Sequence, residues 1–319
     1  MGGTVKRVLV TGGAGFVGRH AIPALAARGF EIHAAGRTEP EGVHAFHAAD
    51  LLDPGQRRAA VQRAGASHLL HLAWVTTPGR YWQTPDNLDW TAASLDLVRA
   101  FRETGGRRAV VAGTCAEYDW TTIARLGEAT AAGTGHLPES APCDPATLYG
   151  AAKDGLHRIL ASYAASAGLS LAWGRLFYLY GPGETPGRLV GDAARALLAG
   201  QRLATSEGRQ RRDFLHIADA GAAFSALLDA PVEGAVNIGS GTAVSVRSIL
   251  EEIGARTGRP DLIDFGARPL GPAEPACIEA DIRRLADEVG FCPRYGLKRG
   301  LAETVASWRA ALSNGASGP

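Results

Sequence analysis

The chain has 319 residues, of which 46% are hydrophobic and 20% charged, a composition typical of a folded globular protein and not of a disordered one. A formal net charge of +1 provides no field that would attract nucleic acid or an anionic membrane, so we expect a small-molecule ligand instead. The four cysteines have no paired spacing and lie near no histidine cluster, which argues against a metal site and a disulfide scaffold. No export signal or apolar run of about 18 residues is visible, so we expect a cytoplasmic protein.

Short β-rich runs alternate with helical patterns from the start of the chain to about residue 176. The predicted strands are residues 7–10, 31–35, 67–72, 109–113 and 170–176, and the predicted helices are residues 16–28, 90–103 and 148–165. This alternation predicts an α/β fold, a Rossmann-type doubly wound parallel sheet. We expect residues 1–176 to form this domain, with a returning segment at about 212–240. Residues 177–319 are expected to form mainly a smaller C-terminal substrate-binding lobe, with a helix at 189–198 and a strand at 214–217.

A glycine-rich turn, TGGAGFVG at residues 11–18, follows the first predicted strand and precedes an apolar helix. The first glycine permits a tight turn, the second lets backbone amides approach a pyrophosphate, and the third allows close packing of helix and sheet. The same spacing also occurs in turns that bind nothing, but the order of strand, turn and helix favours a dinucleotide. The predicted cofactor contacts in this turn are Gly12, Gly15, Phe16, Val17 and Gly18.

The end of the second predicted strand favours NADP over NAD. Gly36 stands where an NAD-binding domain normally has an acidic residue for the ribose 2′-hydroxyl. The guanidinium of the next residue, Arg37, can pair with the 2′-phosphate of NADP, although an arginine there can also be a solvated surface charge. Asp50 and Leu51, which lie between the predicted strands 31–35 and 67–72, are candidate contacts of the adenine edge. The alternative for Asp50 is an aspartate that begins a turn.

A phenol and an ammonium share one helix face, because Tyr149 and Lys153 are four residues apart. A phenol with a pKa near 10 exchanges protons poorly at neutral pH unless a neighbouring cation stabilises its anion. Thr114, at the end of the predicted strand 109–113, supplies a hydroxyl for the substrate oxygen. Each of the three also has an ordinary structural explanation, and an isolated YxxxK is weak evidence of catalysis.

Taken in order, the motifs resemble an extended short-chain dehydrogenase/reductase of the NAD-dependent epimerase/dehydratase family. They are TGGAGFVG, the DL pair at residue 50, HLAW at 71–74, GTCAEY at 113–118, YGAAK at 149–153, YGPG at 180–183, RRDFLHIAD at 211–219 and NIGSG at 237–241. The last three resemble the nucleotide-sugar branch. The resemblance implies that Thr114, Tyr149 and Lys153 form the catalytic triad.

The same resemblance implies further contacts and an assembly. Leu72 and Ala73, within HLAW, would line the cofactor site. Arg212 and Arg268 would contact the diphosphate of a nucleoside-diphosphate sugar. Related proteins pair through two helices that correspond to residues 90–103 and 148–165, so we expect a homodimer.

Departures from the family pattern reduce the number of reactions that the site residues could support. The 4,6-dehydratases carry two acidic residues after the Ser/Thr, where this chain has Cys115 and Ala116. We expect Glu117, one place further, to be turned away by strand alternation. Enzymes that epimerise two carbons need a cysteine one place later than Cys115 and a histidine beyond YGP, and GETPGRLV contains none. The reaction that these departures leave possible is hydride transfer coupled to the transfer of one proton.

The sequence thus predicts NADPH-dependent reduction of a keto group on a nucleoside-diphosphate 4-keto-6-deoxyhexose, with the proton from Tyr149. NADP preference favours net reduction, because 4-epimerases usually retain NAD. A 4-epimerase with retained NAD(P) is the alternative. A 4,6-dehydratase, a non-catalytic NADP-binding sensor and a reductase of non-nucleotide carbonyls are less favoured.

An aromatic loop at residues 74–82 follows the predicted strand 67–72. Its rings would either contact the sugar or base of the ligand or pack on one another. Thr76 in this loop and Cys115 are predicted substrate contacts. Tyr178 is a third, and it stands where the family usually has an asparagine, which indicates an altered substrate. We expect His71 and His216 to be structural, because both lie within strand-like runs.

Overall fold

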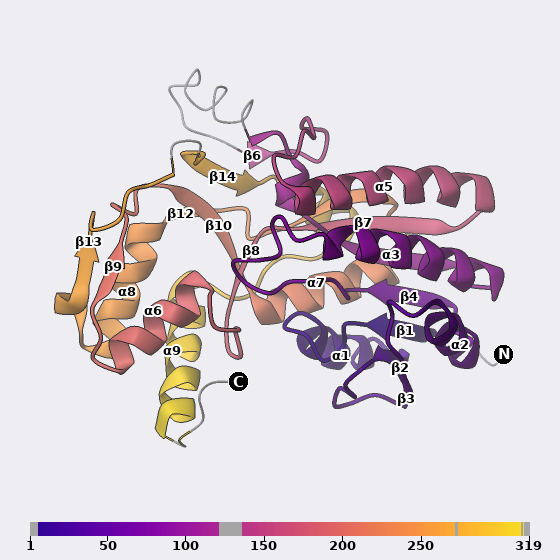
Figure 1. The fold of residues 1–319 in the computed structure, drawn as a ribbon, viewed down its shortest axis with the longest axis horizontal. Coiled ribbons are helices and arrows are strands. Elements are labelled where there is room, and N and C mark those ends of the chain that lie inside the picture. Colours follow the sequence, from indigo (N-terminus) through magenta and orange to yellow (C-terminus); the bar gives the residue numbers. More distant parts are fainter. Residues whose placement is uncertain (1–5, 121–135, 272–273, 314, 316–319) are drawn as a thin grey trace.

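A parallel seven-stranded sheet forms the centre of the part of the chain that the computed structural model describes, which is residues 6–120, 136–271, 274–313 and 315 (Figure 1). Its strands, in spatial order, are β3 (Ala45–Ala48), β2 (Glu31–Gly36), β1 (Arg7–Thr11), β4 (His68–His71), β5 (Arg108–Thr114), β7 (Ser170–Leu176) and β11 (Gly234–Ile238). Every pairing between these strands is parallel. The predicted α/β fold is therefore confirmed.

Helices cover both faces of this sheet. On one face lie α2 (Pro54–Ala64), α3 (Asp86–Glu103) and α5 (Leu148–Ala167), and on the other lie α1 (Gly18–Ala26) and α7 (Ile217–Asp229). Alternate residues of β1 supply the two cores, since Val8 and Val10 pack with α1 and α7 while Leu9 packs on the opposite side. The chain thus builds three layers with two buried apolar interfaces.

The strand order reverses between β1 and β4. From β1 the chain runs outward through β2 and β3, and it then returns to place β4 on the other side of β1. In doubly wound sheets the crevice outside the carboxyl ends of the strands at this point is where ligands bind. This geometry locates the candidate site before any side chain is considered.

A second sheet stands beside the first and contains β12 (Ala243–Ser245), β10 (Arg211–His216), β14 (Cys277–Ala280) and β6 (His136–Leu137), with β8 (Tyr178–Tyr180) paired to β10. The short strand β6 comes from the first half of the chain and pairs with β14. Within the segment 212–240, β11 returns to the main sheet, whereas β10 belongs to the second one. The second sheet thus contains a strand from the first half of the chain, β6, and the main sheet contains a strand from the second half, β11.

Three helices pack together at the far side of the second sheet, namely α6 (Leu189–Leu198), α8 (Val246–Thr257) and α9 (Leu297–Ser313). Leu197, Ile253 and Trp308 are buried between them. Strands β9 (Leu203–Thr205) and β13 (Ile263–Phe265) pair beside them. None of the described helices combines the length and apolarity that crossing a membrane requires.

A buried carboxyl caps α6 from a distance. The N-cap residue of this helix, Arg188, makes no side-chain cap hydrogen bond. Instead, Oε2 of Glu184 accepts a hydrogen bond of 2.7 Å from the backbone N–H of Gly191 in the first turn. The side chain of Glu184 is buried, and this burial raises its pKa to about 8 against the opposing effects of the Gly191 hydrogen bond and the Arg188 charge.

Stability should therefore depend on pH through Glu184. The folded protein holds the proton of this carboxyl up to pH about 8, whereas the unfolded chain releases it near the usual value of 4.5, so the stabilisation is fully present below that pH and is lost as pH rises through 8. Relative to Glu184→Gln, the free energy of unfolding of the wild type should fall by at most about 1.4 kcal/mol for each pH unit across this window. Urea titrations of both proteins at several pH values measure this difference in the free energy of unfolding.

The control for this titration is Glu251→Gln on α8, where the carboxylate is exposed and pairs with Arg247. The stability of this variant relative to the wild type should stay within about 0.5 kcal/mol at every pH. A constant difference between wild type and Glu184→Gln from pH 5 to pH 8 would show that Glu184 is ionised in the folded state.

Candidate active site

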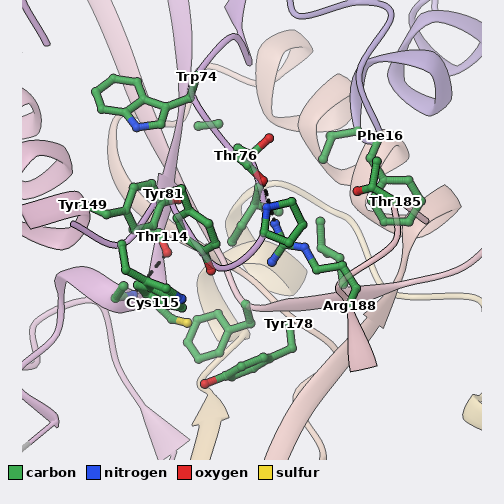
Figure 2. A pocket seen from close by; sticks show the side chains of 18 of the residues that line it. Phe16, Trp74, Thr76, Tyr81, Thr114, Cys115, Tyr149, Tyr178, Thr185 and Arg188 are labelled. Carbon is green, nitrogen blue, oxygen red and sulfur yellow. Dashed lines mark hydrogen bonds between the residues drawn. The ribbon is translucent and has the colours of Figure 1, made fainter. Parts of the chain in front are cut away.

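A cavity of about 560 Å³ opens at the carboxyl ends of β1, β4 and β5 (Figure 2). Its walls come from the glycine-rich turn, the loop after β4, the segment after β5, the start of α5 and the second sheet. Among the residues predicted from the sequence, those that line it are Gly12, Gly15, Phe16, Val17, Gly18, Leu72, Ala73, Thr76, Thr114, Cys115, Tyr149, Lys153, Tyr178 and Arg212. Residues from widely separated segments of the chain thus meet in one place.

The glycine-rich turn fits the pyrophosphate of a dinucleotide. Gly12 has a φ of 72°, and a Cβ atom there would lie 2.7 Å from the backbone nitrogen of Ala73. A Cβ atom at Gly18 would lie 2.2 Å from the carbonyl oxygen of Gly12. Helix α1 begins at Gly18, its N-cap residue Val17 provides no side-chain cap, and both residues line the cavity.

Tyr149 and Thr114 form the polar centre of the cavity. The Thr114 hydroxyl hydrogen-bonds to the phenol, and Figure 2 shows both side chains at the same end, beside Cys115. Burial raises the pKa of Tyr149 above its ordinary value, and the bond to Thr114 only partly opposes this. The phenol therefore holds its proton at neutral pH, as a proton donor must.

Lys153 lies one helical turn after Tyr149 on α5 and is buried. Its Nζ donates a 2.8 Å hydrogen bond to the carbonyl oxygen of Ala112 and lies 3.7 Å from the ring centroid of Trp74. Burial lowers the pKa of Lys153 to about 7, while the charge of Glu117 opposes the shift. This amine therefore changes charge close to neutral pH.

Glu117 points away from the cavity, but not for the reason predicted from strand alternation. Strand β5 ends at Thr114, and Cys115–Glu117 form a 3-10 turn that sends the Glu117 carboxylate into the core. There it accepts hydrogen bonds from the backbone N–H of Thr114 at 2.8 Å, from Trp173 at 2.9 Å and from Arg175 at 2.8 Å. The carboxylate is fully engaged and unavailable as an acid in the cavity.

Cys115 takes the place beside Thr114 where the dehydratase pattern requires a carboxyl. Its side chain is 7% exposed and lines the cavity. Burial raises the pKa of the Cys115 thiol to about 12, with the positive charge of Arg212 opposing. The Cys115 thiol therefore stays neutral at physiological pH and does not supply the carboxyl that the dehydratase pattern requires.

Arg212 lines the cavity but is already held by the protein. Its guanidinium donates to the carbonyl oxygen of Pro275 at 2.8 Å and pairs with Glu274. The same guanidinium lies 5.8 Å from the ring centroid of Tyr178, whose neighbour on the other side is Phe214. Tyr178 and Arg212 thus form one wall together.

Four predicted ligand contacts lie outside the residues that line the cavity. The side chains of Arg37 and Arg268 are both exposed. Asp50 accepts a hydrogen bond of 3.0 Å from the backbone N–H of Leu52, the turn role that was the alternative for it, and Leu51 is buried in the core. The structure therefore does not bring these four residues together with the catalytic centre.

Several other lining residues are not predicted from the sequence, among them Trp120, Glu184 and Arg188. Arg188 donates a hydrogen bond of 3.5 Å to the carbonyl oxygen of Thr76, and its guanidinium lies 5.2 Å from the ring centroid of Tyr81 (Figure 2). The segment GETPGRLV contains Glu184 and Arg188. Charged residues close behind YGPG were the available signal.

The two histidines expected to be structural are both buried. His71 is bonded through one ring nitrogen to Thr11 at 2.6 Å and through the other to Ser94 at 2.8 Å. His216 stacks on Tyr295 with ring centroids 3.9 Å apart. Neither lines the cavity. Within the described ranges, no group of three or more His, Cys, Asp or Glu side chains is arranged to hold a metal ion.

Comparison with known proteins agrees with this geometry. A model of the NAD dependent epimerase/dehydratase family matches residues 8–239. The UDP-glucose 4-epimerase of Corynebacterium glutamicum is 26% identical over 337 residues, which cover 97% of each chain. The dTDP-4-dehydro-6-deoxy-D-allose reductase of a Streptomyces species is 27% identical over 325 residues, 95% of this chain and 96% of that one.

A solved structure adds the fold to this evidence. The UDP-glucose 4-epimerase of Thermus thermophilus, in complex with NAD, superposes with a TM-score of 0.80 at 25% identity and covers 96% of this chain and 99% of that one. The family match extends over most of the chain and includes the glycine-rich turn, Thr114, Tyr149 and Lys153. This chain therefore belongs to the NAD-dependent epimerase/dehydratase family and is an enzyme of the NAD(P)-dependent oxidoreductase type.

Proposed function

We propose that this enzyme uses NADPH to reduce a keto group on a nucleoside-diphosphate sugar, as in the 4-ketoreduction of a 4-keto-6-deoxyhexose. The observation that carries the proposal is a single proton donor at the reacting centre. Tyr149 and Thr114 are the hydroxyls there, Cys115 is a neutral thiol, and the Glu117 carboxylate is bonded in the core. Beside Thr114 the site thus supports one proton transfer, from Tyr149, and has no carboxyl in the place that the dehydratase pattern requires.

The chain's own residues would act as follows. Thr114 and Tyr149 hydrogen-bond the substrate carbonyl oxygen, and Tyr149 gives it a proton, which its raised pKa keeps available at neutral pH. Lys153, held by the Ala112 carbonyl, stabilises the phenolate that remains. When bound, NADPH supplies the hydride for the carbonyl carbon. Arg212 is the candidate contact of the substrate diphosphate in the cavity. Arg268, which lies outside the cavity lining, is a second candidate contact of the same diphosphate.

The preference for NADPH rests on the end of β2. Arg37 is exposed there, and a Cβ atom at the preceding Gly36 would meet no other atom within 4 Å. This open space beside a guanidinium suits a 2′-phosphate. Asp50 and Leu51 remain candidates for the adenine side of the same ligand.

A 4-epimerase is the second candidate, because relatives with that name match this chain as closely as a reductase does. The two differ in stoichiometry. A reductase consumes one NADPH for each sugar, whereas an epimerase interconverts two sugars with no net change in its dinucleotide. Incubation of the purified protein with NADPH and a panel of nucleoside-diphosphate keto-sugars separates them, and an absorbance of NADPH that never falls would exclude the reductase.

Tyr149→Phe should remove the proton donor and lower kcat/KM about 10²- to 10⁴-fold. Binding of the dinucleotide, measured by calorimetry, should stay unchanged, because a phenyl ring still occupies the place of the phenol. Tyr163→Phe on the same helix α5 is the matched control, since Tyr163 packs against the core instead of lining the cavity. Full activity of Tyr149→Phe would assign the acid to another group.

Arg37→Ala should weaken NADPH selectively. Loss of a charge-assisted hydrogen bond of about 1.5–3 kcal/mol raises the Kd for NADPH about 10- to 100-fold and leaves the Kd for NADH unchanged. Arg309→Ala, at an exposed arginine on α9, serves as the control and should change neither value. Equal effects on both dinucleotides would mean that Arg37 does not read the 2′-phosphate.

We also propose a homodimer through α3 and α5. Leu88 on α3 is 59% exposed and Ile159 on α5 is 53% exposed, and the two helices pack side by side. The double variant Leu88→Glu/Ile159→Glu should sediment as a monomer where the wild type sediments as a dimer, because it buries two charges at the contact. Leu312→Glu on α9 is the control and should remain dimeric. A monomeric wild type contradicts the proposal.

A further inference from the structure

Two aromatic rings pack against Tyr149, and a third packs against one of them. The ring centroids of Tyr81 and Trp82 lie 5.0 Å and 5.8 Å from that of Tyr149, each nearly perpendicular to it. Trp120 extends this surface, with its ring centroid 6.4 Å from that of Trp82. All three line the cavity, and they come from both sides of it, the loop after β4 and the segment after β5. We refer to Tyr81, Trp82 and Trp120 as the aromatic wall.

The polar atoms of two wall residues are committed to the protein. The indole N–H of Trp120 donates to the carbonyl oxygen of Cys115 at 3.0 Å. The hydroxyl of Tyr81 is hydrogen-bonded to Arg188. These residues therefore present ring carbons to the space beside Tyr149, where the adjoining side chain is the neutral Cys115 thiol. The three rings and the neutral Cys115 thiol thus form an apolar part of the lining beside Thr114 and Tyr149, while the ionisable side chains of Lys153, Glu184, Arg188 and Arg212 line other parts of the cavity.

This arrangement constrains the sugar. A carbonyl oxygen that takes the proton of Tyr149 lies within about 3 Å of the phenol oxygen. The two ring carbons beside the carbonyl, and the groups they carry, then lie within van der Waals reach of the wall. A hydroxyl placed against the ring faces loses its water and meets ring carbons, whereas a methyl group gains contact with them.

We propose that the aromatic wall determines specificity by accepting a methyl group and rejecting a hydroxymethyl group on the carbon next to the reacting carbonyl. The inference rests on the proposed function and assigns its preference for a 6-deoxy sugar to Trp82 and Trp120. Tyr149 and Thr114 bind the oxygen that both kinds of sugar share, and the wall discriminates between them.

The test compares matched ligands that differ in one oxygen atom. The probes are nucleoside-diphosphate hexoses and their 6-deoxy counterparts with the same base, in uridine and thymidine series, each with excess NADP⁺. Calorimetry gives the Kd of each sugar, and NADPH formation gives kcat/KM in the direction of oxidation. The wild type should favour the 6-deoxy member about 10- to 100-fold in both quantities.

Trp120→Ala should reduce this ratio towards 1, because water then reaches the added hydroxyl. Trp120→Phe keeps a ring at the same place and should recover at least half of the discrimination on a logarithmic scale. Trp82→Ala tests the wall from the other loop, which keeps the proposal testable if Trp120→Ala fails to fold, as judged by its thermal unfolding.

The outcomes separate the two proposals. Equal Kd values for the two members of a pair in the wild type, or an unchanged ratio in both alanine variants, overturn the role of the wall and leave the proposed function intact. Absence of binding by every nucleotide sugar overturns the proposed function and this inference with it. A 6-deoxy preference that Trp120→Ala abolishes and Trp120→Phe restores supports both.

Discussion

The site depends on the carboxylate of Glu117, which is buried beneath the end of β5. It accepts hydrogen bonds from the backbone of Thr114 and from the side chains of Trp173 and Arg175 on the neighbouring strand β7. These bonds stop β5 at Thr114 and turn the chain, so that the Thr114 hydroxyl faces the cavity. Removing one member of such a buried pair costs about 3–5 kcal/mol, because the other is left uncompensated. Glu117, which does not face the cavity, thus holds Thr114, which does.

Local patterns in the sequence predicted the parts of the site that local structure creates. The glycine-rich turn is specified by its own steric needs, since a side chain at Gly12 or Gly18 would collide with backbone. Tyr149 and Lys153 share a helix face because of their spacing, and α5 presents both to the cavity. Alternating strands and helices likewise determined the layer order. In each case the information lies in a short, continuous window of sequence.

Contacts between distant segments could not be predicted in this way. Arg188 reaches the Thr76 carbonyl across 112 residues of sequence, and Arg212 pairs with Glu274 across 62. Arg19, at the start of α1, likewise donates to the carbonyl oxygen of Gly183. No periodicity records which loops of the two sheets meet over the cavity. The 3-10 turn at Glu117 was missed for a related reason, because the point where β5 ends is set by Trp173 and Arg175 on another strand.

The same burial that shapes the cavity also determines which of its groups hold a proton at rest. Desolvation disfavours charge on three side chains that meet in the cavity, so it raises the pKa of Tyr149 and of Cys115 and lowers that of Lys153 to about 7. The resting site is thus close to neutral, with its mobile proton on the phenol. Release of that proton to a substrate oxygen creates a phenolate, which the nearby amine is best able to stabilise when it is itself protonated. The phenol can thus give its proton to a carbonyl oxygen, and the phenolate can take one back from a hydroxyl, as hydride transfer in either direction requires.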